Sequence, residues 1–474
     1  MLPDVALLRI FDFYMPWISV VNRKESLKEW HTLVHVCRRW RSVVFGSPRR
    51  LELRLYCEAK TPARKMLNIW PPLPIDVSCN GHEVWGIDNI IAALEHSDRI
   101  ENLDFIDPPL QFDKVLAAMQ QPVPILRKLL LWFKDGTAPV LPDSFLGGYA
   151  PQLETLSLSR IPFPGLPKLL LSTTHLVHLI LSTIPDSGYI SPEAIVTGLS
   201  VLTRLERLNI RFESSQNRPD LNSRRPPPRL LLPALTELEF EGSSEYLEDL
   251  VARIDAPLLY RLTITFRVFH QSFFYTPRLA EFISRIPTLK THIEARVFFC
   301  GQYVEVEIGR KLQLKLSCGQ SDWQFSSLAQ VCRSSFPRAL ILAVERLYFL
   351  ENGYWRLQPD IENSQWLELL RPFSAVKHLY LCPVFIRSIA PALQDLVGDR
   401  LTEVLPALQT LFLDETLSSG PVPEAIGQFV AARQLAGHPI AISPWESEFN
   451  SNRRPYICSR GYSLYFGRSR YSSL

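Results

Sequence analysis

The stretch Leu153-Glu154-Thr155-Leu156-Ser157-Leu158 decides the fold of this chain. Its leucines occupy the first, fourth and sixth positions. Side chains alternate between the two faces of a strand, so Leu156 and Leu158 would point to one face while Thr155 and Ser157 point to the other. The stretch therefore predicts a strand with one buried face and one open face.

The same spacing of apolar residues recurs along most of the 474-residue chain. Copies begin at residues 100, 126, 153, 176, 205, 235, 259, 344, 376 and 408, at intervals of 23–32 residues apart from one long gap after 259. Segments with helical features lie between several copies, at residues 87–95, 191–193, 246–254 and 277–286. A strand and a helix in each repeat predict a curved α/β solenoid, irregular in its spacing, with the third, fifth and seventh positions of each strand on the concave surface.

Residues 287–335 depart from this pattern. Within them, residues 303–308 and 312–316 alternate apolar and polar side chains around Gly309-Arg310, which predicts a β-hairpin. This hairpin would either interrupt the solenoid or stand in place of a degenerate repeat.

The first fifty residues have a different character. Apolar residues at helical spacing follow Leu2-Pro3-Asp4, and two further apolar helical patterns cover residues 30–37 and 40–45. Three short helices of this kind cannot bury all their apolar surface among themselves. We therefore expect a partner or the neighbouring domain to cover the remainder.

Two separated motifs in this segment resemble the F-box. Leu2-Pro3-Asp4 with Ile10-Phe11 is similar to the start and end of the first F-box helix, and Val36-Cys37-Arg38-Arg39-Trp40 is similar to its V-C-[KR]-x-W signature. The continuation at residues 43–48 resembles F-box proteins expanded in mushroom-forming fungi. Val5, where the family often has an acidic residue, and the long loop after the first helix depart from the pattern.

The repeats and the N-terminal motifs together resemble F-box proteins with leucine-rich repeats. This resemblance implies a three-helix F-box at residues 1–48 and a solenoid of alternating strands and helices at 49–440. The arginines and tyrosines of residues 441–474 predict a basic, aromatic and poorly ordered tail. It implies a non-catalytic substrate-recognition subunit of an SCF-type E3 ubiquitin ligase, whose partners are a Skp-type adaptor, a cullin reached through it, and a protein substrate. The residues expected to contact the adaptor are Leu2, Pro3, Leu8, Ile10, Phe11, Val36, Cys37 and Trp40. Some of them could instead only hold the three helices together.

The concave positions supply the candidate substrate contacts. In the last three repeats the fifth position is Tyr348, Tyr380 and Phe412, which neighbouring strands would stack into an aromatic ladder. Such a ladder could bind a partner or could simply stabilise the sheet. The charged candidates in the middle repeats are Arg207, Arg211, Glu237, Glu239 and Arg261. These could recognise charges on a substrate or pair with one another across strands.

Other classes of function find little support. The net charge is +3, so no nucleic-acid partner is expected. The chain has no zinc-type cysteine pairs and no recognisable hydrolase, metalloprotease or phosphate-binding motif, so we expect no catalytic residue, metal or cofactor. Scattered cysteines, no secretory signal and no long apolar run favour a cytoplasmic or nuclear protein without a membrane segment. The alternative function is a scaffold outside any ligase, in which the N-terminal helices cap the solenoid.

Overall fold

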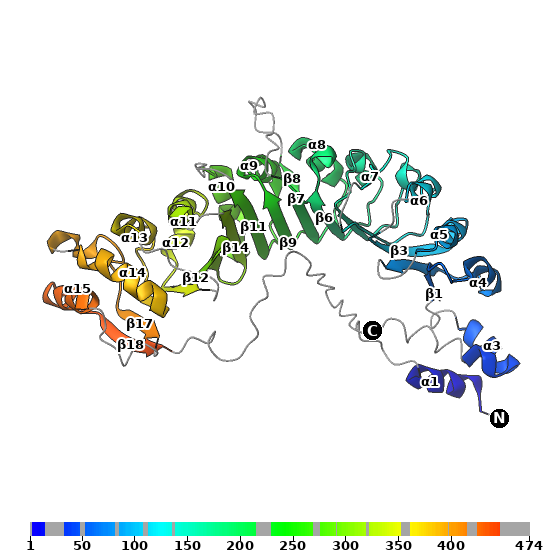
Figure 1. Ribbon diagram of the computed structural model, residues 1–474, viewed down its shortest axis with the longest axis horizontal. Helices are drawn as coiled ribbons and strands as arrows, with labels where there is room; N and C mark the ends of the chain where they lie inside the picture. Colours follow the sequence, from blue (N-terminus) through cyan, green and yellow to red (C-terminus); the bar gives the residue numbers. More distant parts are fainter. Residues whose placement is uncertain are drawn as a thin grey trace.

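The chain forms an arch in which one long sheet lines the inner curve and helices follow the outer curve (Figure 1). The computed structural model describes residues 2–14, 33–47, 53–80, 85–107, 112–134, 138–214, 229–268, 275–290, 292–318, 322–351, 361–396, 398–414 and 424–445. Within these residues the sheet has sixteen strands, nearly all of them parallel to their neighbours. The expected α/β class with a repeating strand–helix architecture is therefore confirmed.

The strands of the sheet are β1 (Leu53–Tyr56), β2 (Ile75–Asn80), β3 (Ile100–Ile106), β4 (Lys128–Trp132), β5 (Thr155–Ser159), β6 (His178–Ile184), β7 (Arg207–Phe212), β9 (Glu237–Gly242), β11 (Arg261–Val268), β12 (Glu294–Cys300), β13 (Tyr303–Ile308), β14 (Leu312–Cys318), β15 (Arg346–Glu351), β16 (His378–Leu381), β17 (Thr410–Asp414) and β18 (Ala441–Trp445). A separate parallel pair joins β8 (Leu230–Leu231) to β10 (Ile254–Asp255).

The α-helices are α1 (Asp4–Tyr14), α3 (Arg38–Phe45), α4 (Ala63–Ile69), α5 (Ile87–Leu94), α6 (Asp113–Ala118), α7 (Leu166–Leu170), α8 (Pro192–Leu199), α9 (Ser244–Arg253), α10 (Pro277–Arg285), α11 (Asp322–Ser334), α12 (Arg338–Leu342), α13 (Asn363–Leu370), α14 (Pro383–Gln394) and α15 (Glu424–Leu435). Short 3₁₀ helices are η2 (Ser97–Arg99), η3 (Phe145–Gly148), η4 (Asp186–Gly188), η5 (Pro287–Leu289) and η6 (Gly398–Thr402). None of the helices in the described ranges is long and apolar enough to span a membrane.

The repeated leucines build the core in the way their spacing predicts. Leu156 of β5 pairs in register with Leu129 of β4 and Leu179 of β6, and all three side chains are fully buried. Thr155, on the opposite face of β5, is half-buried on the concave side. Each buried leucine stabilises the fold by about 1.5–3 kcal/mol.

Backbone hydrogen bonds connect the repeats just before each strand begins. The carbonyl of Arg127 accepts from the N–H groups of Glu154 at 2.8 Å and Thr155 at 3.0 Å. The carbonyl of Glu154 accepts in the same way from Val177 and His178. Side chains reinforce this edge, because the Arg127 guanidinium binds both Glu154 at 2.6 Å and Glu101 at 3.2 Å. These contacts fix the starts of β5 and β6 against the strands that precede them.

The hairpin predicted around Gly309-Arg310 is present and belongs to the main sheet. β13 runs antiparallel to β14 and also to β12, with Val306 opposite both Leu314 and Val297. β14 then pairs in parallel with β11, and β12 pairs in parallel with β15. The order along the sheet is therefore β11–β14–β13–β12–β15, so the region neither breaks the sheet nor forms an ordinary repeat.

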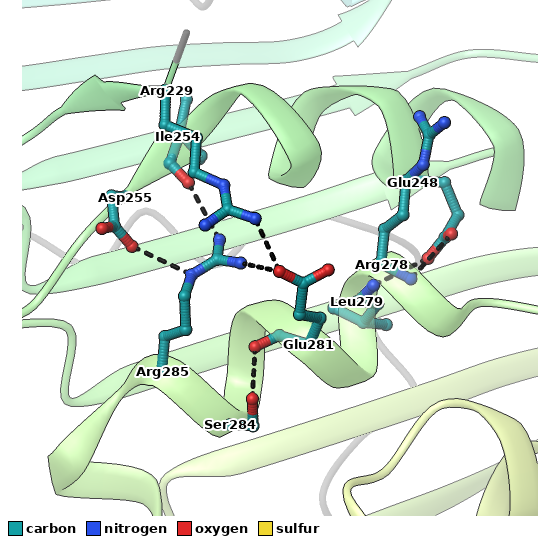
Figure 2. Close-up of polar contacts among 9 residues, drawn as sticks. All are labelled: Arg229, Glu248, Ile254, Asp255, Arg278, Leu279, Glu281, Ser284 and Arg285. Carbon is teal, nitrogen blue, oxygen red and sulfur yellow. Dashed lines mark hydrogen bonds and ion pairs between the residues drawn. The ribbon is translucent and has the colours of Figure 1, made fainter. Parts of the chain in front are cut away.

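The outer helices are joined by polar contacts between neighbouring repeats (Figure 2). The carboxylate of Glu248, on α9, accepts hydrogen bonds from the backbone N–H groups of Arg278 at 3.0 Å and Leu279 at 2.8 Å, at the start of α10. These N–H groups have no partner within their own helix, so the preceding repeat caps the next one. Arg285 at the other end of α10 binds both Glu281 and Asp255.

The sheet extends beyond the predicted boundary at residue 440. β18 pairs in parallel with β17 over Ala441–Trp445, so these five residues belong to the solenoid and not to the tail. The remainder of the predicted tail, 446–474, lies outside the described residues. So does the whole segment 15–32 between α1 and the next helical residues, 33–36.

Candidate interaction surfaces

Helices α1 and α3 pack together beyond the β1 end of the sheet (Figure 1). Phe11 of α1 and Trp40 of α3 meet edge-on, with ring centroids 4.9 Å apart. Arg39 donates to the Asp4 carboxylate at 2.7 Å and to the Leu2 carbonyl, which ties α3 to the start of α1. The conformation of the N-terminal motif therefore depends on the second motif, more than thirty residues later.

Residues of the second motif also hold its own helix in place. Cys37 is the N-cap residue of α3, and its Sγ accepts from the backbone N–H of Trp40 at 3.4 Å. Arg41 donates to the carbonyl of Val34 at 3.0 Å, which connects α3 to the helical residues before it. The three-residue spacing between Cys37 and Trp40 is therefore the spacing that an N-cap requires.

The predicted adaptor contacts divide into two groups by exposure. Leu2, Pro3, Ile10, Val36 and Cys37 are exposed, with Ile10 and Val36 leaving 47% and 56% of their surface open. The rest are covered to different degrees, as Leu8 and Trp40 are half-buried and Phe11 is only 2% exposed. Phe11 is therefore placed inside the helical pack and not on its surface.

One exposed residue was not among the predicted contacts. Val5 leaves 69% of its surface open. In the sequence it was notable only as a departure from the F-box pattern. Its position in the first turn of α1, away from buried Leu7 and Phe11, is the signal that could have identified it. Valine there adds apolar surface to a segment that already exposes Leu2, Ile10 and Val36.

The three predicted aromatic residues do form a ladder on the concave face. Tyr348 stacks on Tyr380 with centroids 4.1 Å apart, and Tyr380 stacks on Phe412 at 4.3 Å, with planes within 11° of parallel. Trp445 of β18 meets Tyr380 and Tyr348 edge-on at 5.4 Å and 6.0 Å. We call these four half-buried rings the aromatic shelf. Trp445 was not predicted, because the sequence places it in the tail.

The charged candidates of the middle repeats pair with one another. Glu237 binds Arg207 at 2.5 Å and Arg261 at 3.6 Å, and also accepts from the Tyr260 hydroxyl at 2.7 Å. These contacts lower the pKa of the Glu237 carboxyl although its burial acts in the opposite direction. The structure thus brings these side chains into a ladder whose charges are compensated internally.

The same pairing includes the other predicted charges and their neighbours. Glu239 binds Arg211 and accepts from Asn209 at 2.6 Å, and Glu241 binds Arg267 at 2.6 Å. Every carboxylate that β9 places on the concave face therefore has a cation beside it.

Strand β13 presents a contrasting arrangement. Glu305 accepts from the amide of Gln313 at 2.5 Å, and Glu307 lies in register with Arg296 of β12. Arg296 instead binds Glu294 at 2.6 Å and lies over the ring of Tyr348 at 5.7 Å. Burial is the main cause that raises the pKa of both Glu305 and Glu307. Among the described residues neither carboxylate has an ion-pair partner.

Comparisons with known proteins give little beyond this geometry. No protein-family model matches the chain, and no curated protein matches it. Among solved structures, the leucine-rich repeat-containing protein LegL7 from Legionella pneumophila aligns with 82% of this chain and 98% of its own, at 13% identity and a TM-score of 0.29. The description of this chain as a leucine-rich-repeat-like solenoid rests on its own strand register and buried leucines.

Proposed function

We propose that this chain is the substrate-recognition subunit of an SCF-type E3 ubiquitin ligase. In this proposal the N-terminal helices are an F-box that docks a Skp-type adaptor, and through it a cullin, while the solenoid holds a protein substrate on its concave face. The chain itself makes or breaks no bond. It raises the effective concentration of the substrate beside the ubiquitin-charged enzyme.

The observation that carries the proposal is the apolar surface of the N-terminal helices. Leu2, Val5, Ile10 and Val36 remain exposed although Phe11 and Trp40 pack the helices against each other. A contiguous exposed apolar patch is typical of a protein–protein contact, and the proposal is that these side chains form one with the partner. The two sequence motifs in the same helices favour a Skp-type adaptor as the partner.

A cytoplasmic or nuclear location is part of the same proposal. Cys57 and Cys79 are free thiols, although the Cys79 sulfur lies 3.1 Å from the Cys57 carbonyl. Neighbouring unlinked cysteines fit a reducing compartment, which is where such ligases act.

The test uses purified full-length chain and purified Skp-type adaptor. A triple variant, Val5→Ser, Ile10→Ser and Val36→Ser, removes exposed apolar surface and leaves the buried contacts intact. A matched control, Ile69→Ser, Leu258→Ser and Val140→Ser, removes apolar residues of similar exposure from the solenoid. We expect the wild type and the control to bind the adaptor in calorimetry, and the N-terminal variant to bind at least about tenfold more weakly.

Two results would count against the proposal. Equal binding by the N-terminal variant would exclude docking through this surface. No binding by a folded wild type would favour the scaffold, in which the helices cap the solenoid. Deletion of residues 1–47 should then leave an insoluble solenoid, whereas a docking motif can be removed without loss of solubility.

A further inference from the structure

Beside the aromatic shelf, the concave face carries two carboxylates that form no salt bridge among the described residues. Across β7, β9 and β11 the carboxylates are paired with arginines. On β13, Glu305 and Glu307 are half-buried and have no ion-pair partner among the described residues. A partly desolvated, unpaired carboxylate costs stability, so a cation supplied by a ligand would have a favourable effect here.

Both carboxylates belong to the inserted strand β13, which is antiparallel to both of its neighbours. The register places Glu305 opposite Lys315 of β14 and Glu307 opposite Arg296 of β12. Both cations have other contacts, because Arg296 binds Glu294 and lies over Tyr348, and Lys315 lies 3.7 Å from the centroid of the Tyr303 ring. The charge of Lys315 still opposes the burial that raises the pKa of Glu305, and the charges of Arg296 and Arg310 do the same for Glu307. Two acidic groups are thus presented on the inner curve without a salt bridge of their own.

The aromatic shelf begins two strands away from these carboxylates. The order β13–β12–β15–β16–β17–β18 places Glu307, Arg296, Tyr348, Tyr380 and Phe412 in one cross-strand row. Neighbouring strands are about 4.8 Å apart, so Glu307 and the first two rings are separated by roughly 10–14 Å. An extended peptide covers that distance with about three or four residues.

We propose that this part of the concave face, from β13 to β18, binds an extended basic segment of a protein. An arginine or lysine of the segment pairs with Glu305 and Glu307, and an aromatic or large apolar residue three or four positions away lies against the edges of the aromatic shelf. The inference extends the proposed function, since the segment would belong to the ligase substrate. Nucleic acid fits poorly, because its phosphates would meet the two carboxylates.

Peptides that differ in charge and in their aromatic residue test the site. The first is a short fluorescent peptide with the repeated sequence Arg-Ser-Ser-Tyr, and the second, of equal length, has glutamate in place of arginine. A third has serine in place of tyrosine. Binding to the full-length chain is measured by fluorescence anisotropy without any adaptor present, so the result does not depend on whether the chain joins a ligase.

The decisive variant is Glu305→Gln with Glu307→Gln, which keeps side-chain shape and removes both charges. The matched control is Asp113→Asn with Glu245→Gln, two exposed acidic residues on the outer helices. We expect the arginine peptide to bind the wild type and the control, and the double glutamine variant to bind at least about tenfold more weakly. The glutamate peptide should not bind, and the peptide without tyrosine should bind more weakly than the arginine–tyrosine peptide.

Several outcomes would overturn the inference. These are absence of arginine-peptide binding to the wild type, equal binding of the glutamate peptide, or unchanged affinity in the double glutamine variant. A circular dichroism spectrum matching the wild type ensures that a loss of affinity does not reflect unfolding. If the peptide binds as expected while the adaptor assay fails, the concave site stands and the ligase assignment does not.

Discussion

Phe11 and Ile10 are neighbours in α1, yet one lies inside the helical pack and the other on its surface. Phe11 is 2% exposed and contacts the Trp40 ring, whereas Ile10 is 47% exposed. Phe11 therefore contributes to the folding of the N-terminal helices, whereas Ile10 is available to contact a partner. Substitutions at these adjacent positions should have different consequences.

Phe11→Ala should unfold the N-terminal helices locally, and Ile10→Ala should not. Loss of a buried phenylalanine costs about 3–5 kcal/mol, which exceeds what a pair of short helices can tolerate. Hydrogen exchange of residues 2–14 and 33–47 is the measurement, with the solenoid as internal reference. Equal protection of these residues in both variants would contradict the packing described here.

Cys37 should be the first of the described cysteines to react with iodoacetamide at neutral pH. Its thiol is exposed, whereas burial raises the pKa of Cys79, Cys332 and Cys382 to about 12 and disfavours their reactive thiolates. Peptide mapping after brief labelling checks the order. Cys37→Ser should retain the cap of α3 while removing this reactivity, since serine is a good N-cap residue.

Glu305→Gln should raise the melting temperature at pH 7 and have little effect near pH 4. Burial raises the pKa of Glu305 above its unfolded value, so the folded state favours the protonated form. The associated stability is present below the unfolded pKa and is lost as pH rises through the folded pKa. Glutamine stays neutral throughout, so the variant keeps this stability at pH 7.

Glu403→Gln provides the control of opposite sign. Hydrogen bonds from Arg371 and Arg400 lower the pKa of the Glu403 carboxyl, so its contribution is present at neutral pH and lost on acidification. This variant should therefore lose stability at pH 7 or leave it unchanged. A higher melting temperature for Glu403→Gln, or a lower one for Glu305→Gln, would contradict the electrostatics described for β13.

Gly309→Ala should destabilise the inserted strands, and Arg310→Gly should be tolerated. Gly309 and Arg310 both have positive φ, 60° and 58°, as a tight hairpin turn between β13 and β14 requires. A Cβ on Gly309 would also lie 2.1 Å from the His292 ring. Urea denaturation should show a lower midpoint for the first variant only. A similar loss in both would mean that the turn does not depend on Gly309.

Much of the solenoid follows from residues that act locally. The leucine spacing predicts the buried face of every copy, Ser191 predicts the start of α8, and Gly309-Arg310 predicts the hairpin. The position of β14 beside β11 does not follow, because strand neighbours are chosen by contacts far apart in sequence. β18 was placed in the tail because its five residues contain a proline and no leucine.

The candidate site was harder to predict than the fold. The aromatic ladder follows from equal positions in consecutive repeats, but Trp445 belongs to no copy of the pattern. Arg207 and Glu305 are both charged concave residues, and only the structure shows that Arg207 forms a salt bridge while Glu305 is bound by the amide of Gln313. Whether a side chain is neutralised depends on neighbouring strands, which sequence spacing alone does not specify.

The crossed order of strands β11 to β15 has a mechanical consequence. A simple repeat array unravels from its ends, since each unit touches only the next. Here the connection through α10 passes from β11 to β12, while the connection through α11 and α12 returns from β14 to β15. If β12 or β14 leaves the sheet, the strands before β11 lose their contact with the strands after β15. Residues 261–351 should therefore be the last part of the sheet to unfold under heat or force, after both ends of the solenoid have separated.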